Sequence, residues 1–75
     1  MTPATGKGRV TNDIRRLREA AGLTQAELGA RVGATRQTIN AIEAEKYAPS
    51  LELAFRIARN FRRPFEDVFG FDDAD

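Results

Sequence analysis

Seventy-five residues without a cysteine or a histidine can form one small domain, and they exclude disulfides and leave zinc only carboxylate ligands. No apolar run approaches the roughly 20 residues of a membrane span, so we expect no membrane partner. We also expect neither a metal, since Cys and His are absent, nor a cofactor. The net charge of +1 is uneven: residues 1–46 hold eight of the twelve Lys and Arg and five of the eleven acids, whereas residues 47–75 are net negative. This asymmetry is typical of a protein that presents a basic side to a polyanion, although ordinary variation of surface charge explains it equally well. The N-terminus lacks the apolar region of a secretory signal, so we expect a cytoplasmic protein.

The first predicted elements are an arm and a short helix. Residues 1–10 contain Thr, Pro, Gly and Lys without periodicity, which indicates a flexible arm. Asn12 is a good N-cap for a helix over residues 13–21, and Gly22 ends it. The apolar stripe of this helix consists of Ile14, Leu17 and Ala21.

Two further helices follow in close succession. Thr24 with Glu27 three residues later is a capping box that opens the second helix, and Gly33 ends it. Thr35 caps a third helix that runs to about residue 44. The apolar positions at helical spacing are Leu28, Val32, Ile39 and Ile42. Because the third helix is anchored on one side only, its other side is expected to face outward.

The last third of the chain predicts two more helices. Ser50 caps the fourth helix, and Pro64 opens a short fifth helix that contains Phe65, Val68 and Phe69. The apolar positions of the fourth helix are Leu51, Ala54, Ile57, Ala58 and Phe61. No alternating strand pattern of useful length is present. Five short helices predict an all-α orthogonal bundle over residues 11–71, followed by an acidic tail at residues 72–75.

The most informative stretch is LREAAGLTQAELGARVGATRQTINAIE, followed by Lys46, Tyr47, the Pro49-Ser50-Leu51 turn and the Ile57-Ala58 pair. With these residues the chain resembles the Xre or lambda-repressor-like helix-turn-helix family over about residues 10–69. The resemblance implies a five-helix lambda-repressor-like DNA-binding domain, with the helix-turn-helix in its second and third helices. It also implies that the third helix lies in the major groove of double-stranded DNA.

The resemblance assigns roles to side chains of the third helix and around it. The residues it implies as base readers are Arg36, Gln37 and Thr38, with Asn40 and Ala41 further along. Arginine can bond guanine O6 and N7 together, and glutamine can pair with adenine, which agrees with that role. The expected phosphate contacts are Gln25, Thr35 and Lys46, supplemented by Arg15, Arg9 and Lys7. Each of these residues also has a plainer interpretation as a helix cap, a solvated face or an ordinary surface charge.

Arg18 and Glu43 correspond to the family's partly buried ion pair between the first and third helices, a structural role. Other positions depart from the family. Glu45 stands where a Gly usually follows the third helix, so either the helix runs further or Glu45 is left-handed at a cost of about 1 kcal/mol. It also weakens the expected phosphate contact at Lys46. Arg62 and Arg63 replace a Gly and an aliphatic residue, and Gly29 replaces Ala, which costs roughly 1 kcal/mol of helix propensity.

Four apolar residues fall off the main core stripes, namely Leu53, Phe55, Phe69 and Phe71. We predict that they form a two-fold dimer contact, because so small a domain can hardly bury them all; closure over the monomer's own core is the alternative.

The resulting functional hypothesis is a sequence-specific transcriptional regulator, expected to be a repressor, that binds a palindromic operator as a homodimer and is associated with the nucleoid when bound to DNA. An antitoxin or other partner-binding protein, with a toxin as partner, is the alternative. An enzyme is not expected, since the chain has neither His nor Cys to supply a nucleophile or base.

Overall fold

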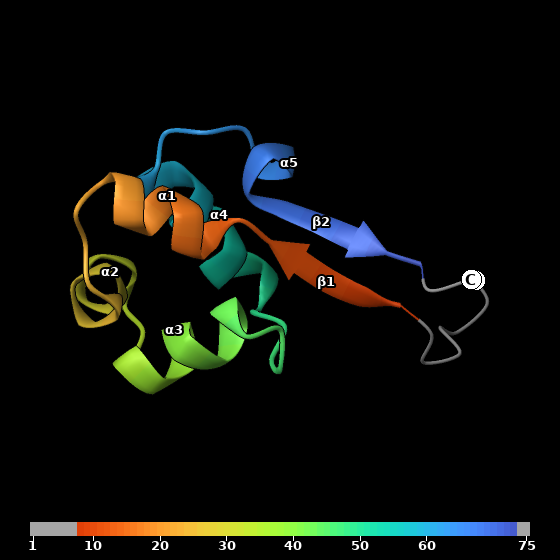
Figure 1. The fold of residues 1–75 in the computed structure, drawn as a ribbon, viewed down its shortest axis with the longest axis horizontal. Helices are drawn as coiled ribbons and strands as arrows, with labels where there is room; N and C mark the ends of the chain where they lie inside the picture. The colour runs from red at the N-terminus through yellow and green to blue at the C-terminus, as the bar shows by residue number, and fades with distance from the viewer. Residues whose placement is uncertain (1–7, 74–75) are drawn as a thin grey trace.

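In the computed structural model, which describes residues 8–73, a helical body carries a pair of strands that projects from one side (Figure 1). The elements in chain order are β1 (Arg9–Asn12), α1 (Ile14–Ala20), α2 (Gln25–Val32), α3 (Arg36–Glu43), α4 (Leu51–Asn60), α5 (Phe65–Val68) and β2 (Phe69–Asp72). The predicted all-α, five-helix domain is confirmed, and the strand pair is a small addition to it. β1 and β2 pair antiparallel, with Val10 opposite Phe71 and Asn12 opposite Phe69.

The helices begin where the sequence predicted them because side chains satisfy the first backbone N–H groups. Thr24 Oγ1 accepts from the backbone N–H of Glu27 at 3.0 Å, and Glu27 Oε1 accepts from that of Thr24 at 2.8 Å. Ser50 Oγ accepts from the backbone N–H of Leu53 at 3.2 Å in the same way. An N–H group in the first turn of a helix has no acceptor inside the helix. Each of these capping bonds supplies the acceptor and so stabilises the start of its helix.

The core lies where the five helices face one another. Its buried members are Ile14, Leu17, Leu28, Val32, Ile39, Ile42, Ala54, Ile57, Ala58, Val68 and Phe69. Fully burying one such aliphatic side chain contributes about 1.5–3 kcal/mol, so this cluster is the main stabilising term. Two predicted core residues lie outside it: Ala21, the C-cap of α1, is exposed, and Leu51, the first residue of α4, is 67% exposed. Both occupy helix ends, where the side chain extends past the neighbouring helices.

The strand pair corrects the predictions for the two ends of the chain. Arg9 and Val10 were expected in a flexible arm, and Phe69 was expected in the fifth helix, but they lie in β1 and β2. Residue 69 has extended backbone angles, and its ring is only 6% exposed. The expected acidic tail likewise begins inside β2, at Asp72. Lys7 and the rest of the arm through residue 7, together with residues 74–75, lie outside the described residues.

Candidate functional site

The turn between α2 and α3 is fixed by backbone contacts. Gly33 caps α2 with a φ of 78°, a left-handed conformation that favours glycine. The backbone N–H of Ala34 donates to the carbonyl of Gly29 at 2.9 Å, and a Cβ at position 29 would lie 2.5 Å from the Ala34 carbonyl oxygen. Position 29 therefore accommodates only glycine unless the backbone shifts, which explains the departure from alanine. Thr35 Oγ1 then accepts from the backbone N–H of Thr38 at 3.1 Å and opens α3.

α3 has one buried and one exposed side. Ile39 is fully buried and Ile42 is 1% exposed, so these two side chains fix the helix on the core. Figure 1 shows α3 in green along one edge of the helical body, with its outer side turned away from the other helices. The side chains on that outer side are Arg36, Gln37 and Asn40, which are exposed, and Thr38 and Ala41, which are half-buried. Within residues 8–73 the side chains of Arg36 and Gln37 have no hydrogen-bond or ion-pair partner, so their donors are available to a ligand.

Behind α3, Arg18 and Glu43 form a largely buried, bidentate ion pair. Arg18 Nε lies 2.6 Å from Glu43 Oε2 and Nη2 lies 3.1 Å from Oε1, with the two side chains 12% and 5% exposed. Arg18 Nη1 donates to the carbonyl of Leu23 at 2.9 Å. The hydrogen bond to Glu43 raises the pKa of Arg18 above its ordinary value, against the opposing effect of burial. The pair links α1 to the last turn of α3 and so orients the outer side of α3.

Gln25, the first residue of α2, extends its side chain toward α3. Its Nε2 donates to Glu43 Oε1 at 3.1 Å and to Asn40 Oδ1 at 3.2 Å. The Gln25 amide therefore joins the buried ion pair to the exposed Asn40. The sequence pattern identified all four of these residues but not this connection, because none of them is adjacent in the chain.

The end of α3 is held by β1. Asn12 Nδ2 donates to the carbonyl of Ile42 at 2.8 Å, while Asn12 Oδ1 accepts from the backbone N–H of Ile14 at 3.1 Å. One asparagine thus bonds both the first residue of α1 and the last turn of α3, although the N-cap of α1 is Asp13 and not Asn12 as the sequence predicted. Arg9 Nε lies 3.3 Å from Glu45 Oε1, a second contact between β1 and the same helix end. Sequence analysis missed the contact of Asn12 with α3, since nothing local predicts a contact over 30 residues.

Of the two conformations predicted for residue 45, the left-handed one is present, with a φ of 60°. The backbone N–H of Glu45 donates to the carbonyl of Ile42 at 2.9 Å, and that of Lys46 donates to the carbonyl of Ala41 at 3.0 Å. These two bonds form a Schellman motif in which Glu45 occupies the position that glycine usually takes. Lys46 is exposed just beyond it, next to the end of the outer side of α3.

The remaining predicted phosphate contacts are partly engaged within the chain. Arg15 lies 3.3 Å from Glu19, and Arg9 is paired with Glu45 as described, although both arginines stay exposed. Thr35 Oγ1 donates to Thr38 Oγ1 at 3.0 Å in addition to its capping bond. In the described part of the chain no helix is long and apolar enough to span a bilayer.

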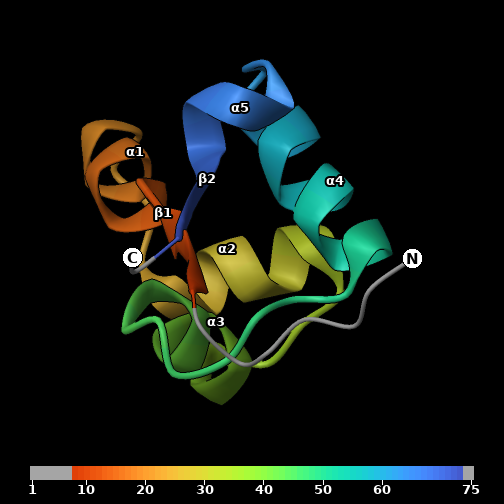
Figure 2. The ribbon, with the colours of Figure 1, turned by 90° about the vertical axis from the view of Figure 1, so that its right-hand side faces the viewer.

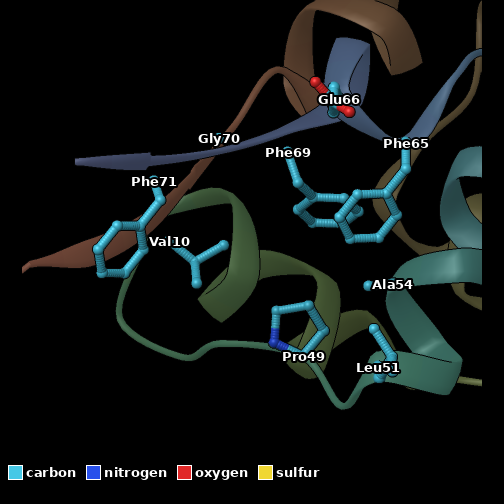
Figure 3. A pocket seen from close by; sticks show the side chains of 9 residues that line it. All are labelled: Val10, Pro49, Leu51, Ala54, Phe65, Glu66, Phe69, Gly70 and Phe71. Carbon is cyan, nitrogen blue, oxygen red and sulfur yellow. The ribbon is translucent and has the colours of Figure 1, made fainter. Parts of the chain in front are cut away.

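The predicted dimer residues separate into two groups. Phe69 is buried and Leu53 is half-buried against the core, so neither offers much surface to a partner. Phe55 and Phe71 are 48% and 62% exposed. Phe71 lies at one rim of an open apolar groove of about 630 Å³, shown in Figure 3. The groove is lined by Val10, Pro49, Leu51, Ala54, Phe65, Glu66, Phe69, Gly70 and Phe71.

Comparison with known proteins agrees with this geometry. A family model described as helix-turn-helix matches residues 14–68. A relative from Methanothermobacter thermautotrophicus is 56% identical over 61 residues, which cover 80% of this chain and 88% of the relative. A relative from Archaeoglobus fulgidus is 52% identical over 60 residues, covering 80% and 86%. A relative from Bacillus subtilis is 45% identical over 62 residues, covering 83% and 94%. All three are named uncharacterized HTH-type transcriptional regulators.

A solved structure shares the fold. The crystal structure of a protein from Bacteroides fragilis matches 81% of this chain and 98% of its own, with a TM-score of 0.72 and 20% sequence identity. At that identity the match supports the fold alone.

Proposed function

Because the chain belongs to the Xre-like helix-turn-helix family, we propose that it is a DNA-binding transcriptional regulator that recognises a specific sequence. The observation that carries this proposal is the outer side of α3. Ile39 and Ile42 fix the helix to the core, and the donors of Arg36 and Gln37, in its first turn, have no partner among the described residues. A short helix presented in this way fits the major groove, with its N-terminal residues at the base edges. There Arg36 would bond guanine O6 and N7, and Gln37 would pair with adenine, with Thr38 and Ala41 alongside them.

Phosphate contacts on either side of α3 would hold it in register. Lys46 is exposed just beyond the last turn of α3, and Thr35 is exposed at its first turn. The start of α2 lies beside α3, where Gln25 contacts Asn40 and Glu43. Both hydrogens of the Gln25 amide are engaged by Asn40 and Glu43, so we assign a phosphate here to the backbone N–H of Gln25 rather than to its side chain. Arg9 and Arg15, each paired with an acid, contribute less to this attraction.

We further propose that two copies associate through the apolar groove. Leu51, Phe55 and Phe71 are 67%, 48% and 62% exposed, which corresponds to about 300 Å² of apolar side-chain surface in each copy, given 150–250 Å² for an aromatic side chain. Patches of this size on small soluble proteins commonly mark an interaction site.

The groove suits a second copy of this chain in particular. The Phe71 ring lies beside the groove, so a two-fold axis lets each Phe71 enter the groove of the other copy. Figure 2 shows α3 at the bottom of the molecule, and a two-fold axis that runs vertically in that view would leave both α3 helices on one side of the dimer. Two α3 helices about 34 Å apart would read successive major grooves of a palindromic operator. A dimer bound at such an operator would repress transcription.

In vitro selection of bound duplexes at a stated salt concentration tests the reading of bases. The wild-type protein is expected to select an inverted repeat. Arg36→Ala is expected to relax the preference at one position of each half-site, by about 1–3 kcal/mol, whereas Lys46→Ala weakens binding to all sequences alike. An unchanged selection profile for both Arg36→Ala and Gln37→Ala would refute the assignment.

Sedimentation at micromolar concentration, with and without DNA, tests the pairing. Phe71→Ser is expected to convert a dimer to a monomer, and Arg63→Ser, at an exposed position outside the groove lining, serves as the control. A wild-type protein that stays monomeric in both conditions contradicts the dimer. The groove would then be a binding site for a different protein, as the antitoxin alternative requires.

A further inference from the structure

The buried ion pair sets the orientation of two side-chain amides that lead to the surface of α3. Glu43 is paired with Arg18 through both of its oxygens, and the oxygens of a carboxylate only accept hydrogen bonds. The Gln25 group that lies 3.1 Å from Glu43 Oε1 must therefore be its NH2 and not its carbonyl oxygen. The second hydrogen of that NH2 is directed at Asn40, 3.2 Å away, so Asn40 must turn its carbonyl oxygen toward Gln25.

This order of donors and acceptors leaves Asn40 with a hydrogen-bond donor, its NH2 group, to offer to a ligand. Its carbonyl oxygen is directed at Gln25, and its NH2 has no hydrogen-bond partner within residues 8–73. Asn40 itself is exposed on the side of α3 that also carries Arg36 and Gln37. A freely rotating asparagine can offer a donor and an acceptor together, the combination that pairs with adenine N6 and N7. Asn40 cannot do this without breaking its bond to Gln25.

We infer that Asn40 is a specificity-determining residue that acts only as a hydrogen-bond donor and selects a base with acceptors in the major groove. This inference rests on the proposed function and deepens it. Guanine presents two acceptors there, N7 and O6, whereas cytosine presents the N4 donor. Guanine is therefore the expected base opposite Asn40, and cytosine is the base rejected most strongly. Gln25 is a positioning residue, which acts on the base through Asn40.

The decisive variant is Asn40→Asp, which has the same shape but replaces the NH2 by an oxygen. One carboxylate oxygen still accepts from Gln25, and the other now faces the groove as an acceptor. In vitro selection is expected to show a guanine preference of at least about fivefold at one position of the wild-type half-site. The preference is expected to reverse toward cytosine in Asn40→Asp. Asn60→Asp makes the same change from amide to carboxylate on α4, away from the proposed DNA-contacting residues, and serves as the control, because it should leave the preference at this position unchanged.

A second variant tests the role of Gln25. Gln25→Leu removes the donor that holds the Asn40 carbonyl, so Asn40 can turn and pair with adenine. The discrimination between guanine and adenine at the Asn40 position is expected to fall, although Gln25 does not touch that base. A merely structural role for Gln25 would lower the melting temperature and leave this discrimination unchanged.

The outcomes separate this inference from the proposed function. A wild-type protein that selects no sequence overturns both. If the wild type selects a sequence but Asn40→Asp weakens all sequences uniformly, Asn40 contacts phosphate, and only the present inference fails. It fails also if Asn40→Asp keeps the guanine preference. Thermal unfolding of each variant checks that a lost preference does not come from a lost fold.

Discussion

Replacement of Arg18 by alanine is expected to lower the free energy of unfolding by about 3–5 kcal/mol, the cost of leaving one member of a buried ion pair without its partner. The side chain of Glu43 is 5% exposed, and two of its three side-chain donors, at 2.6 and 3.1 Å, come from Arg18. Only Gln25 would remain to compensate the carboxylate. For a domain of this length the total stability is about 4–11 kcal/mol, at roughly 0.05–0.15 kcal/mol per residue. The variant should thus melt at least about 12 °C lower, at roughly 4–8 °C per kcal/mol.

Urea unfolding followed by circular dichroism measures this loss, and a double variant serves as its control. In Arg18→Met with Glu43→Leu both charges are absent, so no uncompensated carboxylate is buried and most of the stability should return. The difference between the single and the double variant isolates the cost of the unpaired charge. A loss below about 1 kcal/mol in Arg18→Ala is the value of a solvated surface pair, and it would refute the conclusion that this pair is desolvated.

Three further changes test local features of the fold. Gly29→Ala should destabilise the protein by about 1–2 kcal/mol despite a gain in helix propensity of roughly 1 kcal/mol, because the new Cβ meets the Ala34 carbonyl at 2.5 Å; a higher urea midpoint would contradict this. Arg62→Gly should stabilise it by about 1 kcal/mol, since Arg62 is left-handed with a φ of 54°, and an unchanged melting temperature would show that the strain is absent. The hydrogen bond from the backbone N–H of Thr24 lowers the pKa of Glu27, so the charged capping box stabilises the protein above the unfolded pKa and is lost as the pH falls through the folded value. Glu27→Gln should therefore melt lower than the wild type at pH 7, with a difference that shrinks as the pH falls below the ordinary Glu pKa of about 4.3; a difference independent of pH would argue against this cause.

The helices could be predicted from the sequence because their signals are local. Thr24, Thr35 and Ser50 each cap the helix that follows, and their capping bonds reach only three residues along the chain. The apolar spacing likewise identified Ile39 and Ile42 as the buried side of α3. The helix-turn-helix can therefore be predicted from signals a few residues apart in the sequence. The resemblance to known sequences adds the roles expected of its side chains.

The strand pair could not be predicted in the same way. Each strand has four residues, and the partners stand at opposite ends of the chain, with Val10 opposite Phe71. Neither strand is long enough for alternation to be distinctive, and the pairing follows from how the helices place the two ends. This is why Phe69 was expected in α5 although it enters β2 and packs into the core.

The polar connections around α3 were also beyond sequence reasoning. Gln25, Asn40 and Glu43 each had a separate expected role, but the two bonds from one amide that join them depend on the crossing of α2 and α3. Arg9 was expected to attract phosphate, and its pairing with Glu45 depends on the left-handed end of α3. Residue types and spacing thus located the site, whereas the direction of its hydrogen bonds needed the fold.

The central claim, that the outer side of α3 meets DNA, is tested most directly by titration of ¹⁵N-labelled protein with the duplex selected in vitro. The largest amide chemical-shift changes are expected at residues 35–41 and at the starts of α2 and the segment after α3. The exposed positions of the loop between α4 and α5, which lies outside both α3 and the groove lining, should change little. Changes confined to the side of the molecule away from α3, with residues 36 and 37 unaffected at saturation, would contradict the account.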